Sequence, residues 1–265
     1  MMKPINGPFL EYGFYSHTTE DRVLFTDLIQ ILLSMGAHLV GDGYVFQIKD
    51  DESGLFTDRH LRNLQRIPMT TASDLETYLT DPNLRVVSVE MSGASDTTRD
   101  VAECITYLRT SAAASNYRRN PVALQTNGEY FCNFDAEPLV ATKRFVQRAN
   151  TLGLRAYARF IAIVKQIMPS YATLSVERSL KCPMDLKETG DAYLFHDFYV
   201  STAFVGERSM DKLRKKYSSA YIEAINDGYY FSCTRILNPS RTQKETTIQY
   251  DNSLMVSEII AASEI

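Results

Sequence analysis

Several features that would identify a common class of protein are missing from this sequence. It contains no tryptophan and only four cysteines among 265 residues. The cysteines are separated by 28, 50 and 51 residues, so they form none of the closely spaced pairs that bind structural zinc. So few cysteines also exclude a disulfide-rich scaffold. The most apolar run, Leu28 to Met35, falls well short of the roughly 20 residues that a membrane-spanning helix requires.

Motifs for phosphate binding and for serine hydrolysis are absent as well. The sequence has no GxxxxGK[ST], GxGxxG or GxSxG pattern, and its four histidines never recur as HxH or HxxxH. We therefore expect no metal and no cofactor. The first residues lack the apolar core of a signal peptide, which predicts a cytoplasmic protein.

The composition is that of an ordinary globular protein, with 45% apolar and 23% charged residues. The net charge of −4 disfavours a generally basic nucleic-acid binder. Charge is unevenly spread, because residues 1–140 hold 11 basic and 19 acidic side chains, whereas residues 141–265 hold 17 and 13. The two halves can attract each other, or either can attract a partner of opposite charge.

The pattern along the chain predicts an α+β protein in two subdomains. An acidic N-terminal subdomain is expected over 1–138, and a second subdomain over 139–265 opens with a long basic helix from Ala141 to Met168. In each, helices should pack on a small mixed or antiparallel sheet. Two further helices are expected: one that Asp96 caps, with Val101, Ile105 and Leu108 on one face, and one from Ser209 to Ile225.

The start of the chain has clear local signals. The aromatic segment from Phe9 to Tyr15 is expected to form a strand. Thr18 or Thr19 should cap the helix that follows, and Gly36 should end it. The segment 135–138 is the expected linker between the two subdomains.

The long basic helix lacks acidic residues altogether. Four of its arginines form two pairs at a spacing of four residues, so each pair shares a face: Arg144, Arg148, Arg155 and Arg159. This stripe is either a solvated face or a binding site for phosphates, RNA or an acidic partner. Nucleic-acid binding through it remains an alternative, although the net charge makes it the less expected one.

The alternative that ranks ahead of nucleic-acid binding is an enzyme with a cysteine nucleophile and a histidine base. The candidate residues are Cys182, His196, Asp197 and Cys233, whose thiol, imidazole and carboxylate groups would act together in a hydrolase or transferase. No flanking motif supports this chemistry, so a non-enzymatic role is favoured. The sequence still leaves room for an active site assembled from ordinary residues.

Aromatic residues crowd the C-terminal strands, and successive strand residues point to opposite faces of a sheet. Some of these aromatics must therefore lie outside the core, where tyrosine is favoured at protein interfaces. We expect partner contacts from Tyr193, Tyr199, Tyr229 and Tyr230. The acidic turn Asp50, Asp51 and Glu52 would steer a basic partner toward this protein.

Three segments of the C-terminal half resemble bacterial immunity proteins of polymorphic-toxin systems: Tyr171 to Glu177, Phe198 to Gly206 and Ala220 to Tyr230. They cover less than half of the chain. The resemblance implies a cytosolic protein without catalytic motifs that covers the active site of a toxin. The leading hypothesis is therefore a non-enzymatic protein-binding module, most specifically an immunity protein that binds and occludes its cognate toxin.

Overall fold

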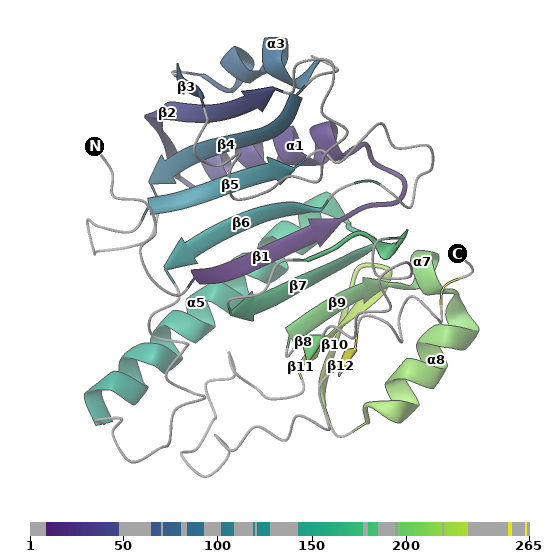
Figure 1. Ribbon diagram of the computed structural model, residues 1–265. Helices are drawn as coiled ribbons and strands as arrows, with labels where there is room; N and C mark the ends of the chain where they lie inside the picture. Colours follow the sequence, from purple (N-terminus) through teal and green to yellow (C-terminus); the bar gives the residue numbers. More distant parts are fainter. Residues whose placement is uncertain are drawn as a thin grey trace.

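The computed structural model describes the sheet, the helices that cover it and several connections between them (Figure 1). The described residues are 9–47, 65–69, 71–80, 84–92, 102–108, 119, 121–127, 143–176, 180–184, 194–195, 197–218, 220–232, 254–255 and 263.

Ten strands form one antiparallel sheet in the order β10-β11-β9-β7-β1-β6-β5-β4-β2-β3. Their bounds are β1 Phe9–Tyr15, β2 His38–Gln47, β3 Gln65–Pro68, β4 Leu84–Ser92, β5 Ala102–Leu108, β6 Val122–Asn127, β7 Tyr171–Val176, β9 Asp197–Ser201, β10 Tyr221–Ile225 and β11 Gly228–Ser232. A second sheet consists of β8 Leu194–Phe195 and β12 Leu254–Met255.

Helices lie on both faces of the large sheet. Two long helices, α1 and α5, pack on one face, behind the sheet in the view of Figure 1, and α8 packs on the other face of the C-terminal strands. The helical bounds are α1 Asp21–Ser34, η1 Ala72–Leu75 (a 3₁₀ helix), α3 Glu76–Leu79, α5 Lys143–Ile167, α7 Thr202–Val205 and α8 Glu207–Lys216. This arrangement confirms the predicted α+β class.

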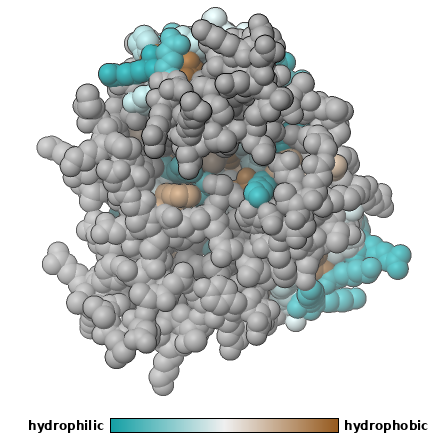
Figure 2. Space-filling view, viewed as in Figure 1, coloured by the Kyte–Doolittle hydropathy of each residue, from teal (hydrophilic) through white to brown (hydrophobic). Residues whose placement is uncertain are grey.

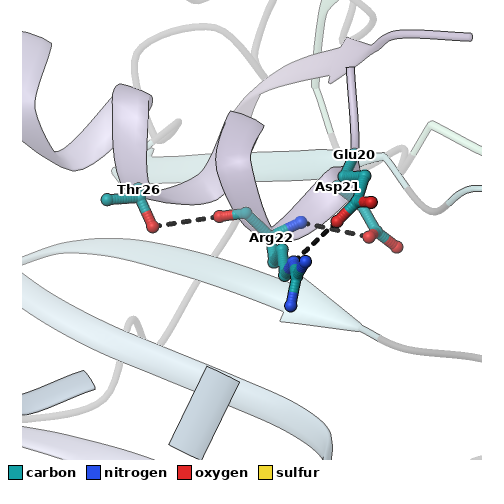
Figure 3. Close-up of polar contacts among 4 residues, drawn as sticks. All are labelled: Glu20, Asp21, Arg22 and Thr26. Atoms are coloured by element: carbon teal, nitrogen blue, oxygen red, sulfur yellow. Dashed lines mark hydrogen bonds and ion pairs between the residues drawn. The ribbon is translucent and has the colours of Figure 1, made fainter. Parts of the chain in front are cut away.

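The N-terminal cap of helix α1 differs from the prediction. We expected Thr18 or Thr19 to cap it, but Glu20 occupies the cap position and makes no capping bond with its side chain. Instead, polar contacts cluster in the first turn (Figure 3): the side chain of Arg22 lies 2.6 Å from a carboxylate oxygen of Glu20, and the hydroxyl of Thr26 donates to the carbonyl of Arg22. All are exposed, so each contributes little to stability.

The end of the same helix follows the prediction closely. Gly36 adopts a φ of 89°, a conformation that glycine reaches without strain. Its amide donates to the carbonyl of Leu33, and the amide of Ala37 donates to the carbonyl of Leu32. This pair of hydrogen bonds is the Schellman motif, which ends α1 one turn before β2 begins.

One predicted helix is wrong, and another was predicted too long. The segment with Ile105 at its centre is strand β5, where Ile105 lies opposite Val89 and Leu124 in the neighbouring strands. The helix predicted from Ser209 to Ile225 ends at Lys216, and its last part is strand β10. In both segments sheet pairing overrides a helical spacing of apolar residues, because β-branched and aromatic residues suit a half-buried strand.

The sheet does not divide into one small sheet for each half. Strand β1, from the N-terminal half, pairs with β6 on one side and with β7, from the C-terminal half, on the other. The larger apolar core likewise joins both halves, since Leu28 of α1 and Phe160 of α5 belong to it. The linker expected at 135–138 lies outside the described residues, so a boundary between 1–138 and 139–265 stays a prediction.

Candidate functional site

Six of the residues singled out in the sequence lie outside the described part of the chain: Asp50, Asp51, Glu52, Tyr193, His196 and Cys233. Their predicted roles therefore remain predictions. The other candidates can be placed. Asp197, Tyr199, Tyr229 and Tyr230 lie on β9 and β11 near one edge of the sheet, and the four arginines lie on α5.

Two of the tyrosines that were expected to contact a partner are buried in the core. Tyr230 is 2% exposed and its hydroxyl donates to Asp197 at 2.5 Å. Tyr199 is fully buried and donates to Asp227 at 3.1 Å. Burial, followed by the nearby carboxylate, raises the pKa of both phenols. The two side chains fix the sheet from within, and the surface proposed below does not include them.

The structure does not bring Cys182 and Asp197 together. Cys182 is buried in the apolar cluster on the α8 side of the sheet. Asp197 points to the opposite side, where one carboxylate oxygen accepts from Tyr230 and the other accepts from Ser232 at 2.7 Å. The sheet separates the thiol from the carboxylate. Both oxygens of Asp197 are thus held by hydroxyl groups, an arrangement that orders a core rather than a histidine base.

The basic stripe on α5 is only partly described, because the side chains of Arg144 and Arg148 lie outside the described residues. Arg155 is exposed, whereas Arg159 is half-buried with its guanidinium 5.9 Å from the ring centre of Tyr12. This distance places Arg159 over an aromatic face of the sheet. The described pair therefore does not act as a single outward-facing row.

A different surface stands out, where helix α5 lies beside edge strand β10. Among the described residues, four large apolar side chains are exposed: Val23 at 43%, Leu154 at 40%, Met168 at 63% and Tyr221 at 42%. Three of them lie on or directly after α5, or on β10. We call this region the α5–β10 surface, made of Leu154, Tyr157, Lys165, Met168, Tyr221, Glu223 and Asn226.

Side-chain bonds join the two elements of the α5–β10 surface. The hydroxyls of Tyr157 on α5 and Tyr221 on β10 both donate to the same carboxylate oxygen of Glu223. Further along, the amide of Asn226 donates to the main-chain carbonyl of Lys165 at 3.1 Å. Contacts at both points show that α5 and β10 run side by side over this stretch.

The tyrosines of this surface are held in fixed positions. The rings of Tyr157 and Tyr221 lie 5.2 and 6.4 Å from the ring of buried Tyr230. Burial raises the pKa of both phenols, and the Glu223 carboxylate raises them further, so each hydroxyl keeps its proton as a donor. A half-exposed aromatic with a fixed rotamer can bind a partner with little loss of conformational entropy.

Sequence reasoning missed this surface because it placed Tyr221 in a helix. One signal was available: Tyr221, Glu223 and Ile225 alternate with other residues, and Asn-Asp-Gly follows at 226–228. Such alternation before a turn sequence is typical of a hairpin. Strands β10 and β11 form that hairpin, with Asn226 at a φ of 50° in its turn.

The opposite face of the same strands carries helix α8 and its basic side chains. The apolar residues Met210 and Leu213 point into the cluster beneath the helix. Hydrophilic side chains gather over α8 at the lower right of Figure 2. The guanidinium of Arg214 lies 4.6 Å from the ring centre of Tyr229, the one predicted contact tyrosine that is described and half-buried.

A histidine and a serine meet where β1 ends and β7 begins. The Nδ1 atom of His17 lies 2.6 Å from the hydroxyl oxygen of Ser170, which also accepts from the backbone amide of His17 at 2.8 Å. Burial and then the charge of Arg119 lower the pKa of His17, so its ring is kept neutral. Ser170 is buried, at 3% exposed, and the contact ties two strands together rather than presenting a nucleophile.

Within the described residues, no three histidine, cysteine, aspartate or glutamate side chains lie close enough to hold a metal ion. In that same part of the chain, no helix has the length and apolarity to cross a membrane.

Comparison with known proteins gives little context. No family model matches the chain, and no curated protein matches it. Among solved structures, the chain is similar to Pseudomonas aeruginosa T6SS protein PA0821, with 13% sequence identity and a TM-score of 0.39. The alignment covers 85% of this chain and 65% of that one, so the chain spans about two thirds of the other protein. A similarity of this size supports no argument about function.

Proposed function

We propose that this chain is a non-enzymatic protein-binding module, and more specifically an immunity protein that binds and occludes a cognate bacterial toxin. The observation that supports the proposal is the α5–β10 surface. Exposed apolar side chains that gather in one place on a folded protein commonly mark an interaction site. Here Leu154 and Met168 lie on and directly after α5, and Tyr221 lies on β10, the strand that hydrogen bonds from Tyr157 and Asn226 join to α5.

The chemistry of this surface fits a protein partner. Tyrosine is enriched at binding hot spots, because it offers a large apolar ring together with a hydroxyl. Tyr157 and Tyr221 already share the Glu223 carboxylate before a partner arrives, so their rings do not have to be ordered on binding. When bound, the sheet and its helices would lie over the active site of the toxin and occlude it.

The test begins with capture of the partner by the wild-type protein in its native cells. The captured protein is then expressed alone and together with this chain in a laboratory bacterium. We expect the partner to arrest growth alone and to be harmless with the wild-type chain. A partner that is harmless alone would contradict the immunity role.

Variants connect this protection to the proposed surface. Leu154→Asp combined with Tyr221→Ala should weaken binding by at least about a hundredfold, since hot-spot residues contribute about 2 kcal/mol or more each. Val23→Asp is the matched control, because Val23 is equally exposed but lies on α1. Equal binding by the double variant and the control would exclude the α5–β10 surface as the contact.

A further inference from the structure

Helix α8 combines an apolar underside with an unusually basic outer face. It carries five basic residues against two acidic ones, and the basic ones concentrate at its end: Arg208, Lys212, Arg214, Lys215 and Lys216. All five are exposed. Cations at the end of a helix oppose the negative pole of its dipole, which explains why they are tolerated there. The same placement concentrates positive charge on a protein whose net charge is −4.

Aromatic rings position two of these cations. Arg214 lies over the ring of Tyr229, and the amino group of Lys216 lies 5.5 Å from the ring centre of Tyr217. Both rings belong to the packed body of the protein, since Tyr217 is buried and Tyr229 is half-buried. A guanidinium held over a ring keeps its planar N–H donors at its edge, where they can bind a carboxylate through two hydrogen bonds.

We infer that the outer face of α8 is a docking site for an acidic protein surface. The inference rests on the proposed function and adds the chemistry of the partner: carboxylates should face α8 while apolar groups face the α5–β10 surface. The two surfaces flank the same edge strand, because α5 packs on one side of β10 and α8 on the other. A single partner that approaches this edge therefore meets both.

A protein fits α8 better than a nucleic acid does. Glu207 and Asp211 lie on the same helix, and Asp211 is 3.7 Å from Arg214. These carboxylates would repel a continuous phosphate backbone but can face basic groups of a mixed protein surface. The Arg214–Asp211 contact is exposed and contributes at most about 1 kcal/mol, so a partner carboxylate can replace it. At ten residues, α8 is about 15 Å long, the width of a modest protein contact.

The test uses a fluorescent 20-residue glutamate-rich peptide as the probe, with the full-length chain at low salt. Arg214→Ala with Lys215→Ala should weaken binding about tenfold, because each exposed charge pair contributes up to about 1 kcal/mol. Arg22→Ala with Arg66→Ala is the matched control, since it removes the same charge from α1 and β3, where both residues are exposed and lie outside the proposed surfaces. The control should bind within about twofold of the wild type. Equal losses in both double variants would mean attraction by overall charge and would overturn the inference.

A single substitution tests whether the guanidinium of Arg214 contributes more than its charge. Arg214→Lys keeps the charge but loses the planar group over Tyr229, so binding should fall about threefold. Lys215→Arg should change nothing. A short DNA duplex that binds α8 more tightly than the peptide would overturn the inference in favour of nucleic acid, and no binding of the peptide would overturn it outright. Neither result depends on toxin capture, so the proposed function keeps its separate test.

Discussion

The two faces of strands β9, β10 and β11 are stabilised in different ways. On the α5 side, tyrosine hydroxyls donate to carboxylates, as Tyr230 does to Asp197. On the α8 side, packing is almost entirely apolar and aromatic, with Phe198 stacked on Tyr171 at 5.8 Å between ring centres. Hydrogen bonds have directional requirements, whereas apolar contacts depend mainly on area and fit. We therefore expect the polar contacts on the α5 side to fix the geometry of these three strands, and the apolar packing on the α8 side to supply more of their stability.

The largest effect should come from the apolar side. Phe198→Ala removes a fully buried ring from the cluster that contains Tyr171 and Phe231. The free energy of unfolding should fall by about 3–5 kcal/mol, as is usual when a buried phenylalanine is truncated. Urea denaturation measures this change. A loss below about 1 kcal/mol would mean that the α8 side is not the main source of stability for these strands.

A smaller effect is expected on the polar side. Tyr230→Phe keeps the ring but removes the hydroxyl that donates to Asp197, so a buried carboxylate loses one of its two described hydroxyl donors. The free energy of unfolding should fall by about 1–3 kcal/mol. Tyr229→Phe, at the preceding residue whose ring faces α8, is the control. It should leave the free energy of unfolding almost unchanged. If the two variants were equally stable, the hydroxyl–carboxylate pair would contribute nothing.

The smallest effect concerns pH. The pKa of His17 in the folded protein lies below its ordinary value of 6.5, so the folded state binds a proton less readily than the unfolded state does. The stabilisation is present above pH 6.5 and is lost as the pH falls through 6.5 toward the folded pKa. Denaturation midpoints between pH 7.5 and 5 should therefore decline more in the wild type than in His17→Gln. Identical declines would show that His17 does not titrate in this way.

The sequence correctly predicted those elements in which the local pattern of residues agrees with the packing in the fold. Strand β1 has the predicted bounds, and α1 ends at Gly36 as expected. The prediction failed at Ile105 and Tyr221, where apolar residues happened to recur at helical spacing but the chain pairs as a strand. At Ile105 the pairing with two neighbouring strands decides the structure, and a short window of sequence does not show it. At Tyr221 the alternation before Asn-Asp-Gly was a local hairpin signal, but the helical spacing was followed instead.

The candidate site was harder to predict than the fold. Tyr199, Tyr229 and Tyr230 were expected to behave alike, yet the pleat directs Tyr229 to one face and Tyr230 to the other. The burial of each tyrosine depends on which helix covers its face, and the sequence did not reveal that α5 and α8 cover opposite sides. The α5–β10 surface required knowledge of which helix lies beside the edge strand.

The central position of β1 has a consequence for the folding rate. Phe9 pairs with Asn127, and Leu10 pairs with Val176, so the two partners of this strand lie 118 and 166 residues further along the chain. Contacts across such separations close large loops before they gain stability, which slows folding. Until β7 arrives, β1 and β6 leave a bare sheet edge that can pair with the same edge of another unfinished copy. The protein should thus depend on timely completion of its own sheet to avoid exchanging strands with its neighbours.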